Sequence, residues 1–154
     1  MKFSPNISES DDPEYWWRES DACRRVVQML LRENDPAARQ TVCDKCHGML
    51  ERAAKAVLCE QGKLGDERSH NIRSLFIKAG LLEALPSRQQ GFISDIANLH
   101  AEAAYPDEVE ERCIWYADAR YQEIVLNAVM VYSQLLSRKG TYGEEGADDS
   151  IGGR

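Results

Sequence analysis

The spacing of apolar residues restricts this chain to helices. Apolar side chains recur every three or four positions in successive segments, and no stretch alternates apolar and polar residues as a half-buried strand does. The sequence therefore predicts an all-α fold, an up-and-down bundle of four to five helices. Five helices are expected around these apolar positions: Trp16, Cys23, Val27 and Leu30; Val42, Cys46, Met49, Ala53, Ala56 and Val57; Ile72, Leu75, Phe76, Ala79 and Leu82; Phe92, Ile96 and Leu99; and Cys113, Tyr116 or Ala117, Ile124, Ala128, Val131 and Leu135.

Asp-Pro pairs and a glycine mark the ends of the first two helices. Asp12 can cap a helix that begins at Pro13, because a proline in the first turn loses no hydrogen bond. Asn34-Asp35-Pro36 ends this helix and starts the second, which we expect from Pro36 to Gln61, with Gly62 as its stop. The other helices are expected from Ile72 to near Pro86, onward from a Ser87 cap, and from Asp107, with Glu110 completing a capping box, to Arg138.

The net charge of −7 is concentrated in the two flanks of the chain. Residues 1–14 hold four acidic residues and one lysine, and residues 140–154 hold four acidic residues and one arginine, which leaves residues 15–139 close to neutral. The overall acidity therefore does not exclude an anionic ligand. We expect a flexible acidic segment at 1–12, a helical bundle at 13–139, and a disordered, acidic, Gly-rich tail at 140–154.

Hydropathy indicates a soluble protein. No run approaches the roughly 18 apolar residues of a membrane-spanning helix. No apolar stretch follows the single lysine near the N-terminus, which is unlike a secretory signal. We therefore expect a cytoplasmic protein without a membrane partner. The adjacent Trp16 and Trp17 are expected at its surface, as apolar area beyond the needs of one bundle.

Cys43-Asp44-Lys45-Cys46-His47 matches the spacing of covalent haem attachment, with His47 as axial ligand. Such attachment takes place outside the cytoplasm, however, and Cys46 lies on the apolar stripe of a predicted helix. Zinc is the other candidate, but a structural zinc site takes four protein ligands and no second motif supplies the fourth. We therefore expect buried thiols, no metal and no cofactor.

A group of charged residues follows this motif on the same predicted helix. Glu51 and Lys55 are four residues apart in the favourable order, and Lys45 and Arg52 lie broadly on the same side, next to His47. One interpretation is a solvated face that stabilises its own helix. The other is a site for phosphate. No nucleophile motif, phosphate loop or dinucleotide fingerprint occurs, so we assign no catalytic residue.

This segment resembles the HEPN domain family (higher eukaryotes and prokaryotes nucleotide-binding). The family's second helix shows His or Gln followed by Glu-Lys-Ala-x-Lys-Ala-x-Leu, and here His47 precedes Glu51-Arg52-Ala53-Ala54-Lys55-Ala56-Val57-Leu58. A histidine before a short Leu-rich helix is similar to His70 and the residues up to Leu75, and the family's Ala-Arg-Tyr-Pro-Asp is similar to Ala103-Ala104-Tyr105-Pro106-Asp107. The resemblance covers about residues 14–139.

The resemblance implies a helical bundle, usually a homodimer, often paired with a nucleotidyltransferase-family protein. It implies a site for a nucleotide, a phosphate or RNA, with these candidate residues: His47, Glu51, Arg52, Lys55, His70, Tyr105 and Asp107. Some members are metal-independent ribonucleases with Arg-x(4–6)-His. No arginine stands at that spacing before His47, His70 or His100, and Ala104 replaces an arginine of many relatives.

We therefore expect a non-catalytic HEPN-like module that binds a nucleotide or polyanion, or that pairs with a nucleotidyltransferase-like protein. A toxin-type ribonuclease with an atypical site is the alternative. A pure scaffold without a ligand is the third interpretation.

Overall fold

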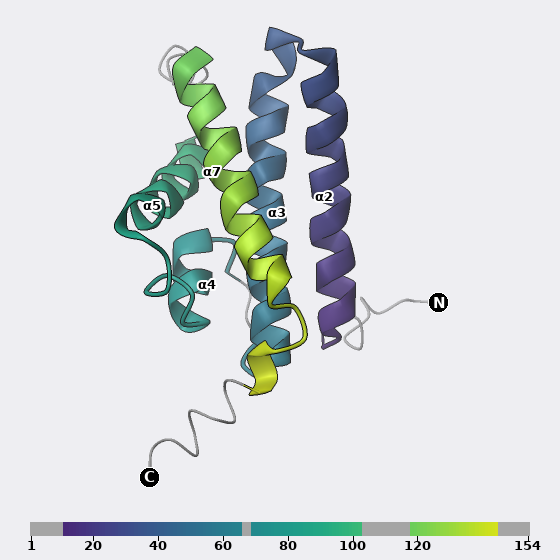
Figure 1. The fold of residues 1–154 in the computed structure, drawn as a ribbon, viewed down its shortest axis with the longest axis vertical. Coiled ribbons are helices and arrows are strands. Elements are labelled where there is room, and N and C mark those ends of the chain that lie inside the picture. Colours follow the sequence, from purple (N-terminus) through teal and green to yellow (C-terminus); the bar gives the residue numbers. More distant parts are fainter. Residues whose placement is uncertain (1–10, 66–68, 103–117, 145–154) are drawn as a thin grey trace.

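The computed structural model of this protein describes residues 11–65, 69–102 and 118–144. Every element in these ranges is a helix, which confirms the predicted all-α class (Figure 1). They are α2 (Pro13–Glu33), a 3₁₀ turn η1 (Pro36–Ala38), α3 (Arg39–Glu60), α4 (Ile72–Lys78), α5 (Ser87–Glu102) and α7 (Asp118–Ser137).

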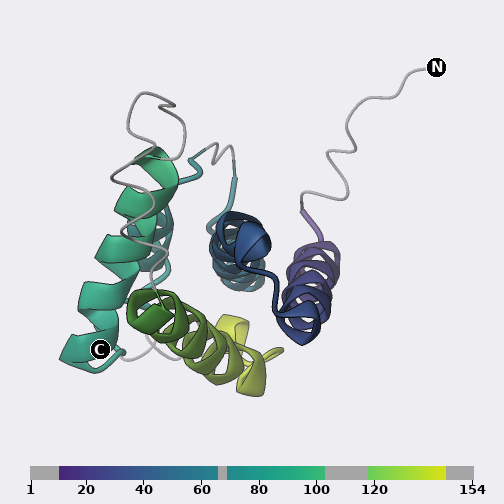
Figure 2. The ribbon, with the colours of Figure 1, turned by 90° about the horizontal axis from the view of Figure 1, so that it is seen from above.

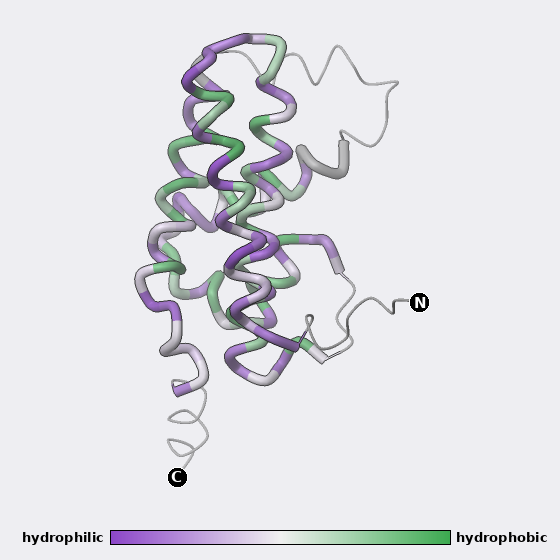
Figure 3. The backbone as a smooth tube through the Cα atoms, turned by 90° about the vertical axis from the view of Figure 1, so that its right-hand side faces the viewer, coloured by the Kyte–Doolittle hydropathy of each residue, from purple (hydrophilic) through white to green (hydrophobic). Residues whose placement is uncertain are grey.

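Helix α3 is the centre of the bundle. It contacts α2, α4, α5 and α7, and Figure 2 shows it between α2 and the other helices. Between Val42 and Leu58 nearly every side chain of α3 is buried, including polar ones, as is typical of a helix surrounded by others. Hydrophilic and hydrophobic residues alternate in short blocks along the described helices (Figure 3).

None of these helices combines the length and the hydropathy that spanning a bilayer requires.

The predicted Asp-Pro starts are confirmed at both positions. The Asp12 carboxylate accepts a hydrogen bond from the Glu14 backbone N–H (3.0 Å), and Asp35 accepts one from Ala37 (3.0 Å). Asn34 ends α2 in the left-handed conformation, with φ of 51°. The second predicted helix is divided, because Pro36–Ala38 forms a 3₁₀ turn and the α-helix itself begins at Arg39.

The predicted third helix was too long. It ends at Lys78 rather than near Pro86, because Gly80 adopts a φ of 72° and the Leu81 N–H turns back to the Phe76 carbonyl (2.8 Å). The start of α5 also differs by one residue. The Pro86 carbonyl accepts hydrogen bonds from Gln89 and Gln90, so Pro86 holds the capping position that we had predicted for Ser87.

The ordered bundle extends beyond residue 139, so the predicted tail began too early. Tyr142 is fully buried in the core, and its hydroxyl donates to the Leu135 carbonyl (2.8 Å). The Glu60 carboxylate accepts hydrogen bonds from the backbone N–H groups of Gly140 (2.9 Å) and Tyr142 (3.2 Å). These contacts hold residues 140–144 against the end of α3. Residues 1–10 of the predicted N-terminal segment (1–12), residues 145–154 of the predicted tail (140–154) and the predicted helix start at Asp107 lie outside the described residues.

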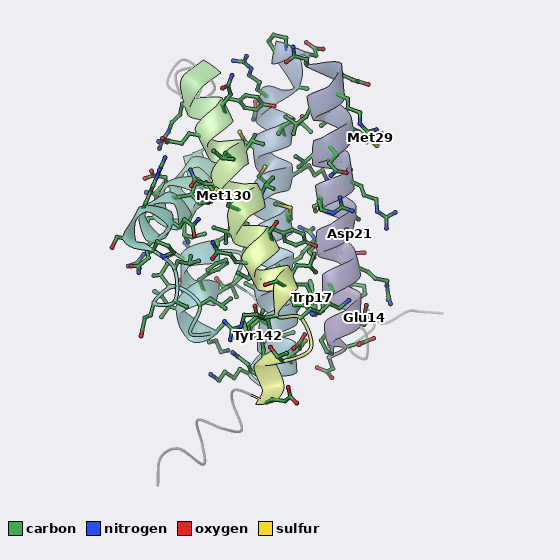
Figure 4. The ribbon with its side chains drawn as sticks, viewed as in Figure 1. Glu14, Trp17, Asp21, Met29, Met130 and Tyr142 are labelled. Carbon is green, nitrogen blue, oxygen red and sulfur yellow. The ribbon has the colours of Figure 1, made fainter. Side chains whose placement is uncertain are left out.

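The prediction of an exposed Trp16-Trp17 pair was wrong. Trp17 is buried, and its indole N–H donates to Glu60 (2.7 Å), so this side chain belongs to the same junction as Tyr142 (Figure 4). Trp16 is half-buried and packs against the core. The two indoles therefore pack where the start of α2 meets the end of α3.

Candidate functional site

The Glu51 carboxylate on α3 lies close to three of the polar side chains that the sequence predicted as candidates. Glu51 Oε2 lies 3.2 Å from Lys55 Nζ and 2.7 Å from His70 Nδ1, and its other oxygen lies 3.7 Å from His47 Nδ1. His47, Glu51 and Lys55 are four residues apart, so they follow one row along the helix. His70 arrives from the segment before α4. We call these four residues the Glu51 cluster.

The local sequence explains how His70 reaches the helix. Asn71 caps α4, because its side chain accepts from the Ser74 N–H (3.0 Å) while its backbone stays extended. The Ser69 hydroxyl accepts from the Asn71 N–H (3.1 Å). This capping arrangement ends the connection from α3 just before α4 and leaves His70 as the residue beside Glu51.

The Glu51 cluster is mostly buried, which overturns the interpretation as a solvated helix face. Glu51 is 8% exposed and Lys55 is 6% exposed, and His47 is more deeply buried than either. Lys55 Nζ also lies 5.1 Å above the centre of the Trp16 ring, so the ammonium is enclosed by a carboxylate and an indole. The His70 side chain, by contrast, is 73% exposed. It is the member of the cluster that solvent reaches.

Glu51 is the negative centre of the cluster. Burial disfavours its charged form, but the hydrogen bond from His70 and the charge of Lys55 outweigh that effect, and the pKa of Glu51 is lowered below its ordinary value. The carboxylate is therefore ionised at neutral pH and accepts from Nδ1–H of His70. That contact fixes which ring nitrogen points inward and leaves Nε2 as the nitrogen that a ligand would meet.

The remaining predicted residues lie elsewhere. Arg52 donates to the Gly48 carbonyl (3.2 Å) on the side of α3 that faces Cys23, and no described contact joins it to the Glu51 cluster. Gly48 permits this arrangement, since a Cβ there would lie 2.7 Å from the guanidinium. Tyr105 and Asp107 lie outside the described residues. The structure thus brings together His47, Glu51, Lys55 and His70 of the seven candidates.

Trp16 is the residue of the site that the sequence did not identify. It lies 39 positions before Lys55, and only the packing of α2 on α3 brings the two side chains together. Its edge-to-face contact with Tyr15, at 5.1 Å between ring centres, fixes the indole further. No short-range pattern in the sequence pointed to this contact.

The thiols of the haem-like motif belong to the core. Cys43 and Cys46 are buried, and burial raises the pKa of Cys43 to about 12 and that of Cys46 further. A neutral, enclosed thiol is a poor metal ligand and nucleophile. Among the described residues, no group of three or more potential ligands is placed to hold a metal ion.

A cavity of about 550 Å³ lies away from the Glu51 cluster, between the start of α2 and residues 140–144. Its charged lining is mainly acidic, with Lys139 as the base: Asp12, Glu14, Glu60 and Glu144. Lys139 already pairs with Glu14 (2.9 Å). This lining is unfavourable for a phosphate.

A comparison with protein-family models matches residues 13–138 to the HEPN domain. This chain belongs to the HEPN domain family. The match runs from the first residue of α2 to the residue after α7, so it includes the Glu51 cluster and stops before Tyr142. Membership makes the protein a nucleotide-binding or ribonuclease-type module at the level of the family. No curated protein and no solved structure matches the chain.

Proposed function

We propose that this protein is a non-catalytic HEPN module that binds a nucleotide or another polyanion at the Glu51 cluster. The observation that carries the proposal is the contact between the buried Glu51 carboxylate and the exposed His70 ring, 2.7 Å from Nδ1 to Oε2. It supports binding because a histidine held at Nδ1 presents Nε2 outward. On protonation both nitrogens donate, one to Glu51 and one to a phosphate oxygen.

The energetics of the cluster also support a functional role. A buried ion pair contributes little stability relative to apolar side chains of the same volume. The pair of Glu51 and Lys55 lies on the most buried helix, whose buried neighbours are mostly apolar. Ionisable groups with shifted pKa values and specific charged partners are more frequent at functional sites than in structural cores.

Calorimetric titration of the whole protein with ATP tests the proposal. Wild-type protein is expected to bind, and His70→Ala is expected to weaken binding about tenfold, the value of one charge-assisted hydrogen bond. Arg73→Ala is the matched control, because Arg73 is an exposed base three residues away on α4. A flat wild-type titration at millimolar ATP would refute nucleotide binding and favour the scaffold interpretation. Equal losses in both variants would also refute it, because they would indicate general charge attraction.

A ribonuclease with an atypical site is the second candidate function. The same contact favours it, since an exposed histidine oriented by a buried carboxylate is the arrangement of a general base. The absence of Arg-x(4–6)-His weighs against it, because no arginine of that motif would hold the scissile phosphate. We therefore expect no cleavage when the protein is incubated with RNA in EDTA. Cleavage that persists in EDTA and is lost in His70→Ala would replace the binding proposal with the catalytic one.

Family membership carries two further parts of the proposal. The module would work as a homodimer, and it would pair with a nucleotidyltransferase-family protein in a toxin–antitoxin-like system. We also propose that it is cytoplasmic. Cys23, Cys43 and Cys46 agree with that location, because they are buried as thiols and form no disulfide, as expected in a reducing compartment.

A further inference from the structure

A smaller cavity, of about 140 Å³, lies between α5 and α7, which are not the elements that carry the Glu51 cluster. The two helices contact each other on one side of the bundle (Figure 1). One face of α5, from Arg88 to Asp95, and one face of α7, from Arg120 to Asn127, line this space, which we call the α5–α7 cavity. We propose that the α5–α7 cavity binds a small free amino acid as a zwitterion.

The two helices run antiparallel along the cavity. Gln134 of α7 donates to Gln89 near the start of α5 (3.2 Å), whereas Arg120 near the start of α7 pairs with Asp95 (2.9 Å). Arg88 therefore lies at the end of the cavity that the later residues of α7 form. Seven residues of α5 separate Arg88 from Asp95, a length of about 10 Å. The cavity thus has a base at one end and an acid at the other.

Asn127 is a buried polar side chain with one group left unpaired. It is 6% exposed, and its amide nitrogen donates to the Glu123 carbonyl one turn earlier (2.9 Å). Within the part of the chain that the structure describes, no hydrogen bond reaches its Oδ1, and the residue lines the cavity. A buried amide oxygen without a donor is costly, and asparagine is unfavourable inside a helix. A ligand that donates an N–H in the cavity would satisfy this oxygen.

Gly91 leaves room for such a ligand on the α5 side. It lies within α5 and its φ is not positive, so the backbone does not require a glycine there. A Cβ at this position would meet no atom within 4 Å. Glycine also destabilises a helix interior relative to alanine. An occupant of the cavity that approaches α5 closely accounts for this residue.

Three of the four charged side chains at the cavity are paired with one another. Arg120 bridges Asp95 (2.9 Å) and Glu123 (2.6 Å), and both carboxylate side chains are still 47% exposed, so each has surface left for another cation. Arg88 is exposed and makes no ion pair or hydrogen bond with any other described residue. One unpaired base and two accessible carboxylates favour a ligand that carries both charges over a plain anion or a plain cation.

An amino acid satisfies these groups together. Its carboxylate accepts from Arg88, and its ammonium donates to Asn127 Oδ1 and to Glu123 one turn away. The buried side chains of Phe92 and Ile124 give the cavity an apolar floor for the carbon atoms. One water takes about 30 Å³, so the cavity has room for roughly five non-hydrogen atoms. That is the size of glycine or alanine and much less than a nucleotide.

Nuclear magnetic resonance of the full chain, labelled with nitrogen-15, tests the site with L-alanine as the probe. The side-chain NH₂ signals of Asn127, assigned by their loss in Asn127→Leu, are expected to shift and to saturate at millimolar alanine. Those of the exposed Asn98 on α5 are the internal control and are expected to stay in place. Acetate lacks the ammonium and methylammonium lacks the carboxylate, so each is expected to bind at least tenfold more weakly. Unshifted Asn127 signals would overturn the inference, and so would equal binding of alanine and acetate.

Two substitutions locate the ligand. Arg88→Gln is expected to weaken alanine binding about tenfold, and Arg73→Gln, which changes another exposed arginine on α4, is the matched control. Gly91→Leu is expected to abolish binding because its side chain enters the cavity, while leucine favours the helix. Circular dichroism checks that each variant is folded. Undiminished binding by Gly91→Leu, or equal losses in the two arginine variants, would overturn the inference. None of these results depends on ATP binding at the Glu51 cluster.

Discussion

Replacing Lys55 by methionine would leave the Glu51 carboxylate buried without its closest cation. Lys55 Nζ lies 3.2 Å from Glu51, and both residues are less than a tenth exposed, so water cannot replace the lost charge. Removing one partner of such a pair costs 3–5 kcal/mol in general. Glu51 keeps its hydrogen bond to His70, so we expect Lys55→Met to lower the free energy of unfolding by about 3 kcal/mol, the low end of that range.

The double variant Glu51→Leu/Lys55→Met separates the cost of an unpaired charge from the value of the pair. Two apolar side chains leave no buried charge, so its free energy of unfolding is expected within about 1 kcal/mol of the wild type, and above that of Lys55→Met. Urea unfolding at pH 7.5, followed by circular dichroism, measures all three proteins. If the double variant loses more than Lys55→Met alone, the pair is a net source of stability, and the energetic support for a functional role is lost.

Three other predictions follow from the described contacts. Because the pKa of Glu51 is lowered in the folded protein, its ionisation stabilises the fold at pH values above the ordinary pKa of 4.5, and this stabilisation is lost as the pH falls through the lower folded-state pKa. The difference in unfolding free energy between wild type and Glu51→Gln should therefore shrink below pH 4.5. A difference that grows there would contradict the lowered pKa. Cys43 and Cys46 should stay unmodified by iodoacetamide at pH 8 in the native protein and react in urea, as read by peptide mass spectrometry; rapid native labelling would show that they are not enclosed. Tyr142→Ala should cost about 3–4 kcal/mol in urea unfolding, because it removes a fully buried ring; a loss below about 1 kcal/mol would show that residues 140–144 are not part of the core.

Local patterns were sufficient for the elements themselves. The two Asp-Pro starts, the end of α2 at Asn34 and the stop at Gly62 depend on interactions within a few residues, and the structure has each of them where the sequence predicted it. The end of the third helix was missed because Gly80 was not weighted as a stop. Its left-handed conformation overrides the apolar period that continues to Leu82.

The spacing of residues in the sequence could not predict which polar side chains are buried or which distant residues are in contact. Glu51 and Lys55 have the spacing of a surface pair, and only the position of α3 inside the bundle makes them a buried one. Tyr142 stands in a polar, Gly-rich stretch, and its place in the core depends on Glu60, 82 residues earlier. The row of His47, Glu51 and Lys55 followed from helical spacing. The family resemblance suggested only that His70 lies near this helix, and its contact with Glu51 was not predicted.

The histidine side-chain signals measure the central claim most directly, because the chain has three histidines and their imidazole resonances can be assigned by substitution. Binding of a nucleotide at the Glu51 cluster predicts that millimolar ATP shifts the signals of His70. The buried His47 should move less, and His70→Ala should lose the response. Signals of His70 that stay in place while ATP binds would locate the nucleotide elsewhere, and the role assigned to the Glu51 cluster would be wrong.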